Sequence, residues 1–162
     1  MGTQFREYFT DEVFAQAIQD SSVKVFVSCL SDLTVHVVAI VAESARLAPQ
    51  EAQAIARLCF DKGMRGGLVD IEPAKVPADA RERFEQRLRE TDWSAAAVGA
   101  AAFSLSPVDL PRFAPVVDEF KRLDRKIVAT SIGNKWREVR ASFQDRVVPD
   151  SIASDWRSAS GS

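Results

Sequence analysis

Apolar residues along the chain follow two patterns, short near-continuous runs and longer stretches with helical spacing. The run at residues 23–30 is rich in β-branched and aromatic side chains, which is typical of a central parallel strand buried on both faces. Three further apolar runs predict additional strands at residues 68–71, 95–103 and 127–132. A fifth, short edge strand is expected at residues 147–148.

Helical spacing of apolar residues separates these runs. The predicted helices cover residues 11–19, 33–47, 49–62, 78–91, 110–123 and 135–146. Two assignments stay open. Residues 33–47 begin with several valines, which also permits a strand, and residues 95–105 are rich in alanine, which also permits a buried helix.

Strands that alternate with helices imply right-handed βαβ units. The pattern therefore predicts an α/β fold with a doubly wound, mostly parallel sheet of four or five strands, in the flavodoxin-like order 2-1-3-4-5. Residues 1–150 are expected to form one domain of ordinary size. The serine-rich segment 151–162 is expected to be a flexible tail.

In such a sheet, ligands bind beyond the carboxyl ends of the strands. The polar residues at the predicted strand ends are therefore the candidate ligand-binding residues, with a purely structural role as caps and turns as the alternative. They are Ser28, Ser31, Asp32, Asp70, Glu72 and Ser104.

Composition narrows the classes of partner. Acidic and basic residues are well mixed and give a formal charge of −2, which argues against nucleic acid as a main partner. The segment 1–8 is polar and the longest apolar run, at residues 35–42, is short, so a cytoplasmic location without membrane insertion is expected. Cys29, Cys59 and His36 lie in apolar runs without metal-ligand spacing, so no metal site is expected.

Several phrases of the sequence resemble TIR and TIR-like domains. They are Val25 to Ser28 followed by Ser31 and Asp32, then residues 67–73, 83–92 and 126–128. The resemblance implies a TIR-like, flavodoxin-like fold used in innate-immune signalling. It also implies NAD as a candidate substrate rather than a tightly bound cofactor, because some members hydrolyse NAD with a glutamate on the helix after the third strand.

The corresponding residue here is Glu119, which becomes the candidate catalytic residue through this resemblance. The sequence departs from the family at Pro115, where many members have tryptophan, and in a long segment between the first two strands. A carboxylate pair such as Asp118 and Glu119 on a helix is also typical of a solvated face.

Three function classes remain at this point. The first is a TIR-like signalling domain that processes NAD or another nucleotide when it self-assembles. The second is a non-catalytic module for protein interaction or small-ligand sensing, in which residues 72–77 and the helix surfaces would matter. The third, ranked lowest, is a flavodoxin-like carrier or a receiver-like domain. Self-association or binding of another protein is expected in the first two.

Overall fold

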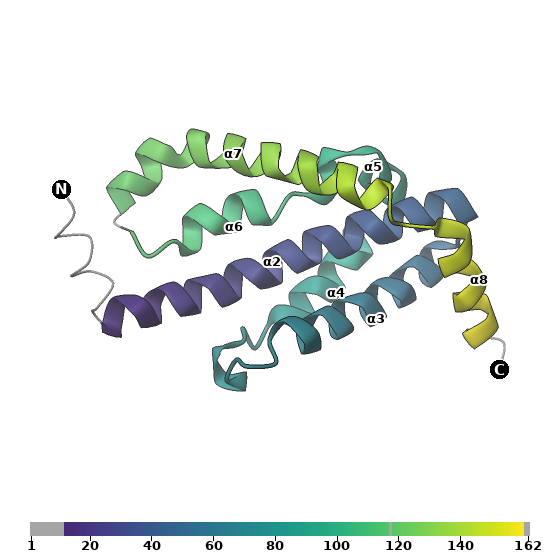
Figure 1. Cartoon of the computed structure of the whole chain (residues 1–162), viewed down its shortest axis with the longest axis horizontal. Helices are drawn as coiled ribbons and strands as arrows, with labels where there is room; N and C mark the ends of the chain where they lie inside the picture. Colours follow the sequence, from purple (N-terminus) through teal and green to yellow (C-terminus); the bar gives the residue numbers. More distant parts are fainter. Residues whose placement is uncertain (1–11, 117, 161–162) are drawn as a thin grey trace.

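The computed structural model describes residues 12–116 and 118–160, and these residues form helices and connecting segments without any strand (Figure 1). The α-helices are α2 (Glu12–Ala45), α3 (Pro49–Gly67), α4 (Ala80–Glu90), α5 (Trp93–Val98), α6 (Ser106–Phe113), α7 (Asp118–Gln144) and α8 (Pro149–Ser160). Two short 3-10 helices, η1 (Pro73–Lys75) and η2 (Ala100–Ala102), lie in the connections.

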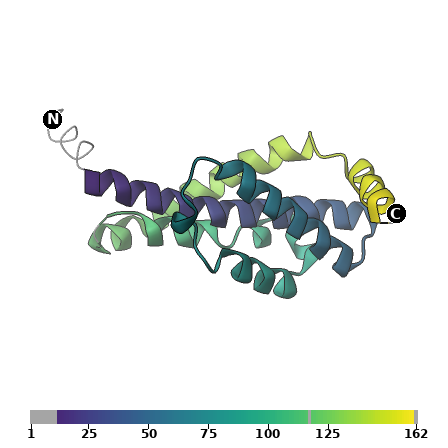
Figure 2. The same ribbon diagram turned by 90° about the horizontal axis from the view of Figure 1, so that it is seen from below.

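Helix α2 is the axis around which the other helices are arranged (Figures 1 and 2). A tight turn at Arg46, which adopts the left-handed conformation with φ 51°, reverses the chain so that α3 runs back along α2. Helices α5, α6 and α8 also pack directly on α2, whereas α7 packs on α6. The chain therefore forms a helical assembly with one long central member.

The prediction of an α/β fold with a flavodoxin-like or TIR-like parallel sheet is wrong. Residues 23–30 lie in the middle of α2, residues 68–71 form the turn after α3, residues 95–103 belong largely to α5 and η2, and residues 127–132 lie within α7. The fifth strand expected at residues 147–148 is the connection between α7 and α8. The intrinsic preference of valine against helix is below about 1 kcal/mol per residue, and burial outweighs it.

Several helix predictions are confirmed. Residues 49–62 lie within α3, residues 78–91 contain α4, and residues 33–45 of the predicted helix 33–47 are helical rather than extended, as the last part of α2. Residues 110–123 are interrupted between α6 and α7, where Pro115 stands. The segment expected to be a loose tail contains most of α8, and Ala153 on that helix is buried. The polar segment 1–8 lies outside the described residues.

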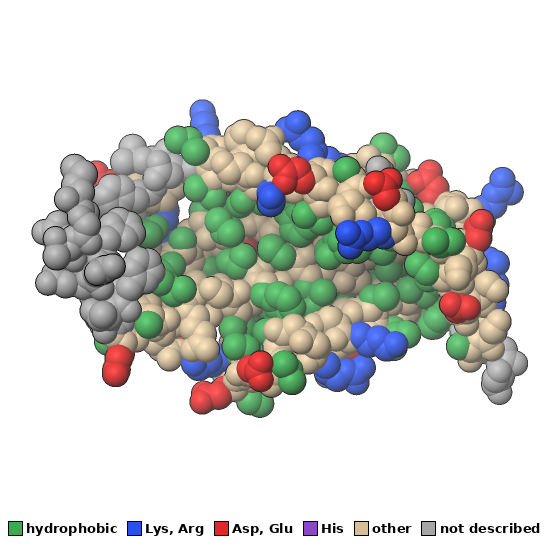
Figure 3. All heavy atoms as spheres, viewed as in Figure 1, with side chains coloured by type: hydrophobic (Ala, Val, Ile, Leu, Met, Phe, Trp, Pro, Cys, Tyr) green, Lys and Arg blue, Asp and Glu red, His purple; other side chains and the backbone are tan. Residues whose placement is uncertain are grey.

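Helix α2 is long and apolar enough to cross a membrane by length and composition, a property that its short apolar runs did not predict. Most of its apolar stretch is buried inside the protein, and part of it is visible between α7 and α3 (Figure 3). Its buried face also carries Asp32 and His36, which have partners on other helices. The role of a core helix accounts for these features.

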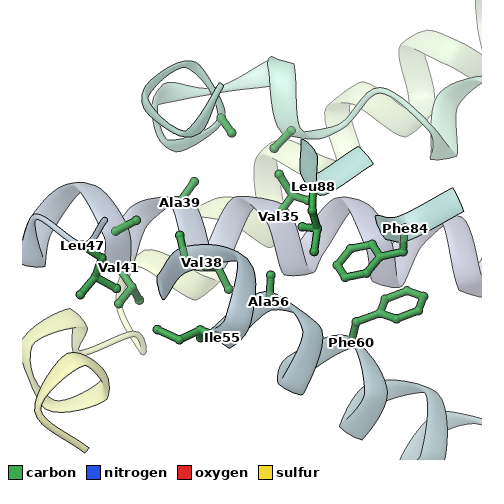
Figure 4. Packing of buried hydrophobic residues seen from close by; sticks show 14 of the residues in the cluster. Val35, Val38, Ala39, Val41, Leu47, Ile55, Ala56, Phe60, Phe84 and Leu88 are labelled. Carbon is green, nitrogen blue, oxygen red and sulfur yellow. The ribbon is translucent and has the colours of Figure 1, made fainter. Parts of the chain in front are cut away.

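The hydrophobic core lies where α2 meets α3 and α4 (Figure 4). Phe60 of α3 stacks on Phe84 of α4 with a distance of 4.0 Å between ring centroids. Gly63 of α3 allows α2 to approach closely, because a β-carbon there would lie 2.5 Å from the Cδ1 atom of Leu30. Phe26 belongs to the run 23–30, which was expected to be buried on both faces of a strand, but it is half-buried in α2 and lies against Gly67.

Candidate functional site

A buried polar cluster lies where the inner face of α2 meets α4, α6 and α7. We define it as Ser28, Ser31, Asp32, Arg83, Arg87, Ser106, Asp109 and Trp136. Three of the predicted binding residues belong to it. Ser28, Ser31 and Asp32 lie on one side of α2 because residues three and four positions apart share a helix face. Helix geometry therefore brings them together, whereas the sequence analysis expected the end of a strand.

Asp32 is the centre of the cluster, and its side chain is 0% exposed. Its carboxylate accepts hydrogen bonds from the backbone N–H groups of Leu105 and Ser106, at 3.2 and 2.8 Å. It also accepts a bond of 2.6 Å from the Ser106 hydroxyl and forms an ion pair of 2.7 Å with Arg87. Asp32 thus caps the first turn of α6 from another helix, a position where no local side chain supplies a cap.

Two side chains extend the contacts of Asp32. Arg87 donates a hydrogen bond of 2.8 Å to the Ser31 hydroxyl and another to the carbonyl oxygen of Ala102. The Ser106 hydroxyl in turn accepts a bond of 2.7 Å from the Trp136 indole N–H. Helices α2, α4, α6 and α7 therefore meet through one continuous hydrogen-bonded network.

A second carboxylate, that of Asp109 on α6, is buried against Ser28, which lies one helical turn from Asp32 on α2. Its Oδ2 atom accepts a hydrogen bond of 2.6 Å from the Ser28 hydroxyl and lies 3.4 Å from a guanidinium nitrogen of Arg83. Both buried carboxylates are thus paired with an arginine from α4. This arrangement satisfies the requirement that buried charges be compensated.

His36 lies one helical turn after Asp32 on α2, in an aromatic environment. Its Nδ1 atom lies 3.0 Å from the carbonyl oxygen of Ala96, its Nε2 atom has no hydrogen-bond partner among the described residues, and its ring packs on Phe103. Burial lowers the pKa of His36 below its ordinary value, and the positive charge of Arg140 adds to this effect. Nearby, burial and the charge of Asp32 raise the pKa of the Cys29 thiol.

The cluster has the residue types of a catalytic site but the geometry of a structural one. The Ser106 hydroxyl is bonded to Asp32 and Trp136, and Ser106 and Asp32 are closed off from solvent. A substrate therefore has no approach to the serine oxygen. Within residues 12–116 and 118–160, no group of three or more His, Cys, Asp or Glu side chains is arranged to hold a metal ion.

The remaining predicted site residues lie apart from this cluster. Asp70 and Glu72 are exposed on the connection between α3 and α4, and Ser104 is exposed just before α6. Glu119, the candidate catalytic residue, is exposed in the first turn of α7. The structure therefore does not assemble the expected strand-end site. A clue to the actual cluster was present in the helical spacing of the polar residues at positions 28, 31, 32 and 36.

The outer face of α2 carries a second feature, which we call the α2 strip. It consists of half-buried apolar side chains at alternating steps of four and three residues, namely Phe26, Leu30, Leu33, Val37 and Ile40. The exposed residues Ser22 and Ser44 bound it at either end. This spacing is the heptad repeat with which a helix packs against a second helix.

An apolar groove runs between α3 and α7 (Figure 3), and the Phe26 and Leu30 side chains of the α2 strip lie against Gly67 and Gly63 on its α3 side. Figure 3 shows hydrophobic side chains gathered along this face between the two helices. Helix α3 packs on α2 and α7 packs on α6, but among the described residues α3 and α7 do not pack on each other. On α3, the groove side carries Cys59, Lys62 and Gly66, because Phe60 turns the opposite flank towards α4.

Comparison with known proteins adds no relative from which a role could be transferred. The chain matches no family model, no curated protein and no solved structure.

Proposed function

We propose that this chain is a non-catalytic protein-interaction module that binds an amphipathic helix of a partner protein in the groove above the α2 strip. The observation that carries the proposal is the heptad spacing of a strip whose side chains remain partly open to solvent, even where Phe26 and Leu30 lie against α3. A groove that accepts the apolar face of one helix is a recurrent mode of peptide recognition.

The shape of the groove favours a single helix over a second copy of the chain. Two identical subunits would have to bring the same surface patch together across a two-fold axis. The α2 strip is recessed between α3 and α7, so two such faces would meet at their rims and leave both strips uncovered. A lone helix about 10 Å in diameter can reach the floor.

The charge of the groove walls indicates which charged residues the partner helix should carry on either side of its apolar seam. Helix α7 has seven Lys or Arg residues against four Asp or Glu. Lys62, on the groove side of α3, is exposed. A partner helix with glutamate or aspartate beside its apolar seam would complement these walls, and opposite charges at such flanking positions select the partner in helical pairs.

A designed peptide tests the proposal directly. The probe is a fluorescent helix of about three heptads with leucine at the seam and glutamate at the flanking positions, and its counterpart has lysine at the same flanks. Fluorescence anisotropy should show saturable binding of the glutamate peptide. The lysine peptide and a scrambled glutamate peptide should bind at least about tenfold more weakly.

Variants of the chain locate the binding surface. Leu33→Asp places a charge in the middle of the strip and should lower affinity at least about tenfold, whereas Val98→Asp on the exposed surface of α5 should not. Lys62→Glu leaves the strip intact and should shift preference towards the lysine peptide. Circular dichroism melts confirm that each variant is folded. Equal binding of all three peptides, or unchanged binding by folded Leu33→Asp, would refute the proposal.

A further inference from the structure

The connection between α3 and α4 forms a hollow on the opposite flank of α3 from the α2 strip. Its volume is ≈ 460 Å³, within the size range of small-molecule sites. The apolar lining includes Met64, Leu68, Ile71 and Val76. Part of this connection, residues 72–77, was predicted from the sequence as an interaction loop, but an open apolar hollow there was not predicted.

The charged residues that line the hollow are both basic. Among the described residues these are Arg65 at the end of α3 and Arg81 in the first turn of α4. Arg65 is exposed and forms no ion pair with a described residue. Arg81 lies 3.1 Å from a carboxylate oxygen of Asp61, yet its side chain is 72% exposed. A guanidinium group has five N–H donors, so one carboxylate partner leaves others for a ligand.

We infer that this hollow binds a small amphipathic carboxylate, with its apolar body against Met64, Leu68, Ile71 and Val76 and its carboxylate between Arg65 and Arg81. Burial of the apolar body supplies most of the affinity. The two arginines supply selectivity for an anion through charge-assisted hydrogen bonds. A cationic or neutral molecule of the same length lacks these bonds.

Isothermal titration calorimetry of the whole chain with decanoate, below its micellar concentration, tests this inference. Decylammonium and decanol are the matched probes, and both should bind at least about tenfold more weakly than decanoate. Simultaneous Arg65→Ala and Arg81→Ala substitutions should also lower decanoate affinity at least about tenfold. Arg89→Ala, an exposed arginine elsewhere on α4, is the control and should leave it unchanged.

Two further measurements assign the binding to this hollow. Val76→Trp fills it and should abolish binding, while amide chemical shifts in the wild-type chain should change mainly at residues 64–81. Leu33→Asp, which alters the groove of the proposed function, should bind decanoate normally, so the two proposals succeed or fail separately. Decylammonium binding as tightly as decanoate, or undiminished decanoate binding by folded Val76→Trp, would overturn the inference.

Discussion

Removing the charge of Asp32 should destabilise the whole helical assembly. In Asp32→Asn the side chain keeps its size, but Arg87 loses its buried carboxylate partner. The amide nitrogen replaces one carboxylate oxygen, so it would face either the Leu105 N–H or the Ser106 N–H and hydroxyl, which are donors themselves. Both effects leave buried polar groups without acceptors.

The expected loss is about 3–5 kcal/mol, the usual effect of removing one member of a buried ion pair. A domain of ordinary size is stable by about 5–15 kcal/mol, so the variant would lose a large share of its stability. Urea unfolding followed by circular dichroism measures the difference. The control is Glu138→Gln, which breaks the exposed pair with Lys135 and should change stability by less than about 1 kcal/mol.

A second substitution separates the loss of the pair from the loss of packing. Asp32→Leu combined with Arg87→Met removes both charges, so it should be less destabilising than Asp32→Leu alone, which leaves the guanidinium buried and unpaired. A loss below about 1 kcal/mol for Asp32→Asn would refute the assignment of Asp32 as the residue that joins the helices.

Three further predictions follow from single contacts. His36 is the only histidine in the sequence, and its pKa in the folded chain is lowered, so the unfolded chain takes up a proton more readily. The free energy of unfolding should therefore be highest above about pH 6.5 and fall as the pH drops below it. A flat pH profile in urea unfolding would contradict this. Gly133→Ala, within α7 and facing open space, should stabilise the chain by about 0.5–1 kcal/mol. Gly63→Ala should stabilise it less, because the new β-carbon meets Leu30. Equal shifts of the two melting temperatures would contradict the close approach of α2 to Gly63. Phe60→Ala should lose about 3–5 kcal/mol in urea unfolding, and a loss below about 1 kcal/mol would show that the ring is not in the core.

The largest difference between prediction and structure lies at residues 23–30. A near-continuous run of valine and other apolar residues is compatible with a buried strand or with a helix buried on most sides, and local propensity favoured the strand. In the structure the run is instead part of one helix, α2, which continues from Glu12 to Ala45 without a break at Ser31 and Asp32. Because the strand assignment failed, the order of the sheet, the strand-end site and the fold implied by the TIR resemblance failed with it.

Amphipathic spacing was sufficient to predict the helices that expose one polar face to solvent. Residues 49–62 were predicted as a helix with Ile55, Leu58 and Cys59 on its inner side, and residues 78–91 as a helix with Phe84 and Leu88 inside and charged residues outside. Of the first three, Leu58 and Cys59 are exposed. Ser28, Ser31 and Asp32 were selected from the sequence as candidate binding residues, but as polar residues at the end of a predicted strand. Their partners, Arg87 and Ser106, lie more than fifty residues away along the chain.

Only the tertiary structure decided which polar residues meet, because nothing in the local pattern of α2 identifies the helices that pack on it. Asp32 is stable as a buried charge once α4 supplies an arginine and α6 supplies two N–H groups. The α2 strip is likewise a surface only because α3 and α7 diverge on either side of it. Local sequence thus set the helical spacing of these residues, while long-range packing determined which of them are bonded, buried or open to a partner.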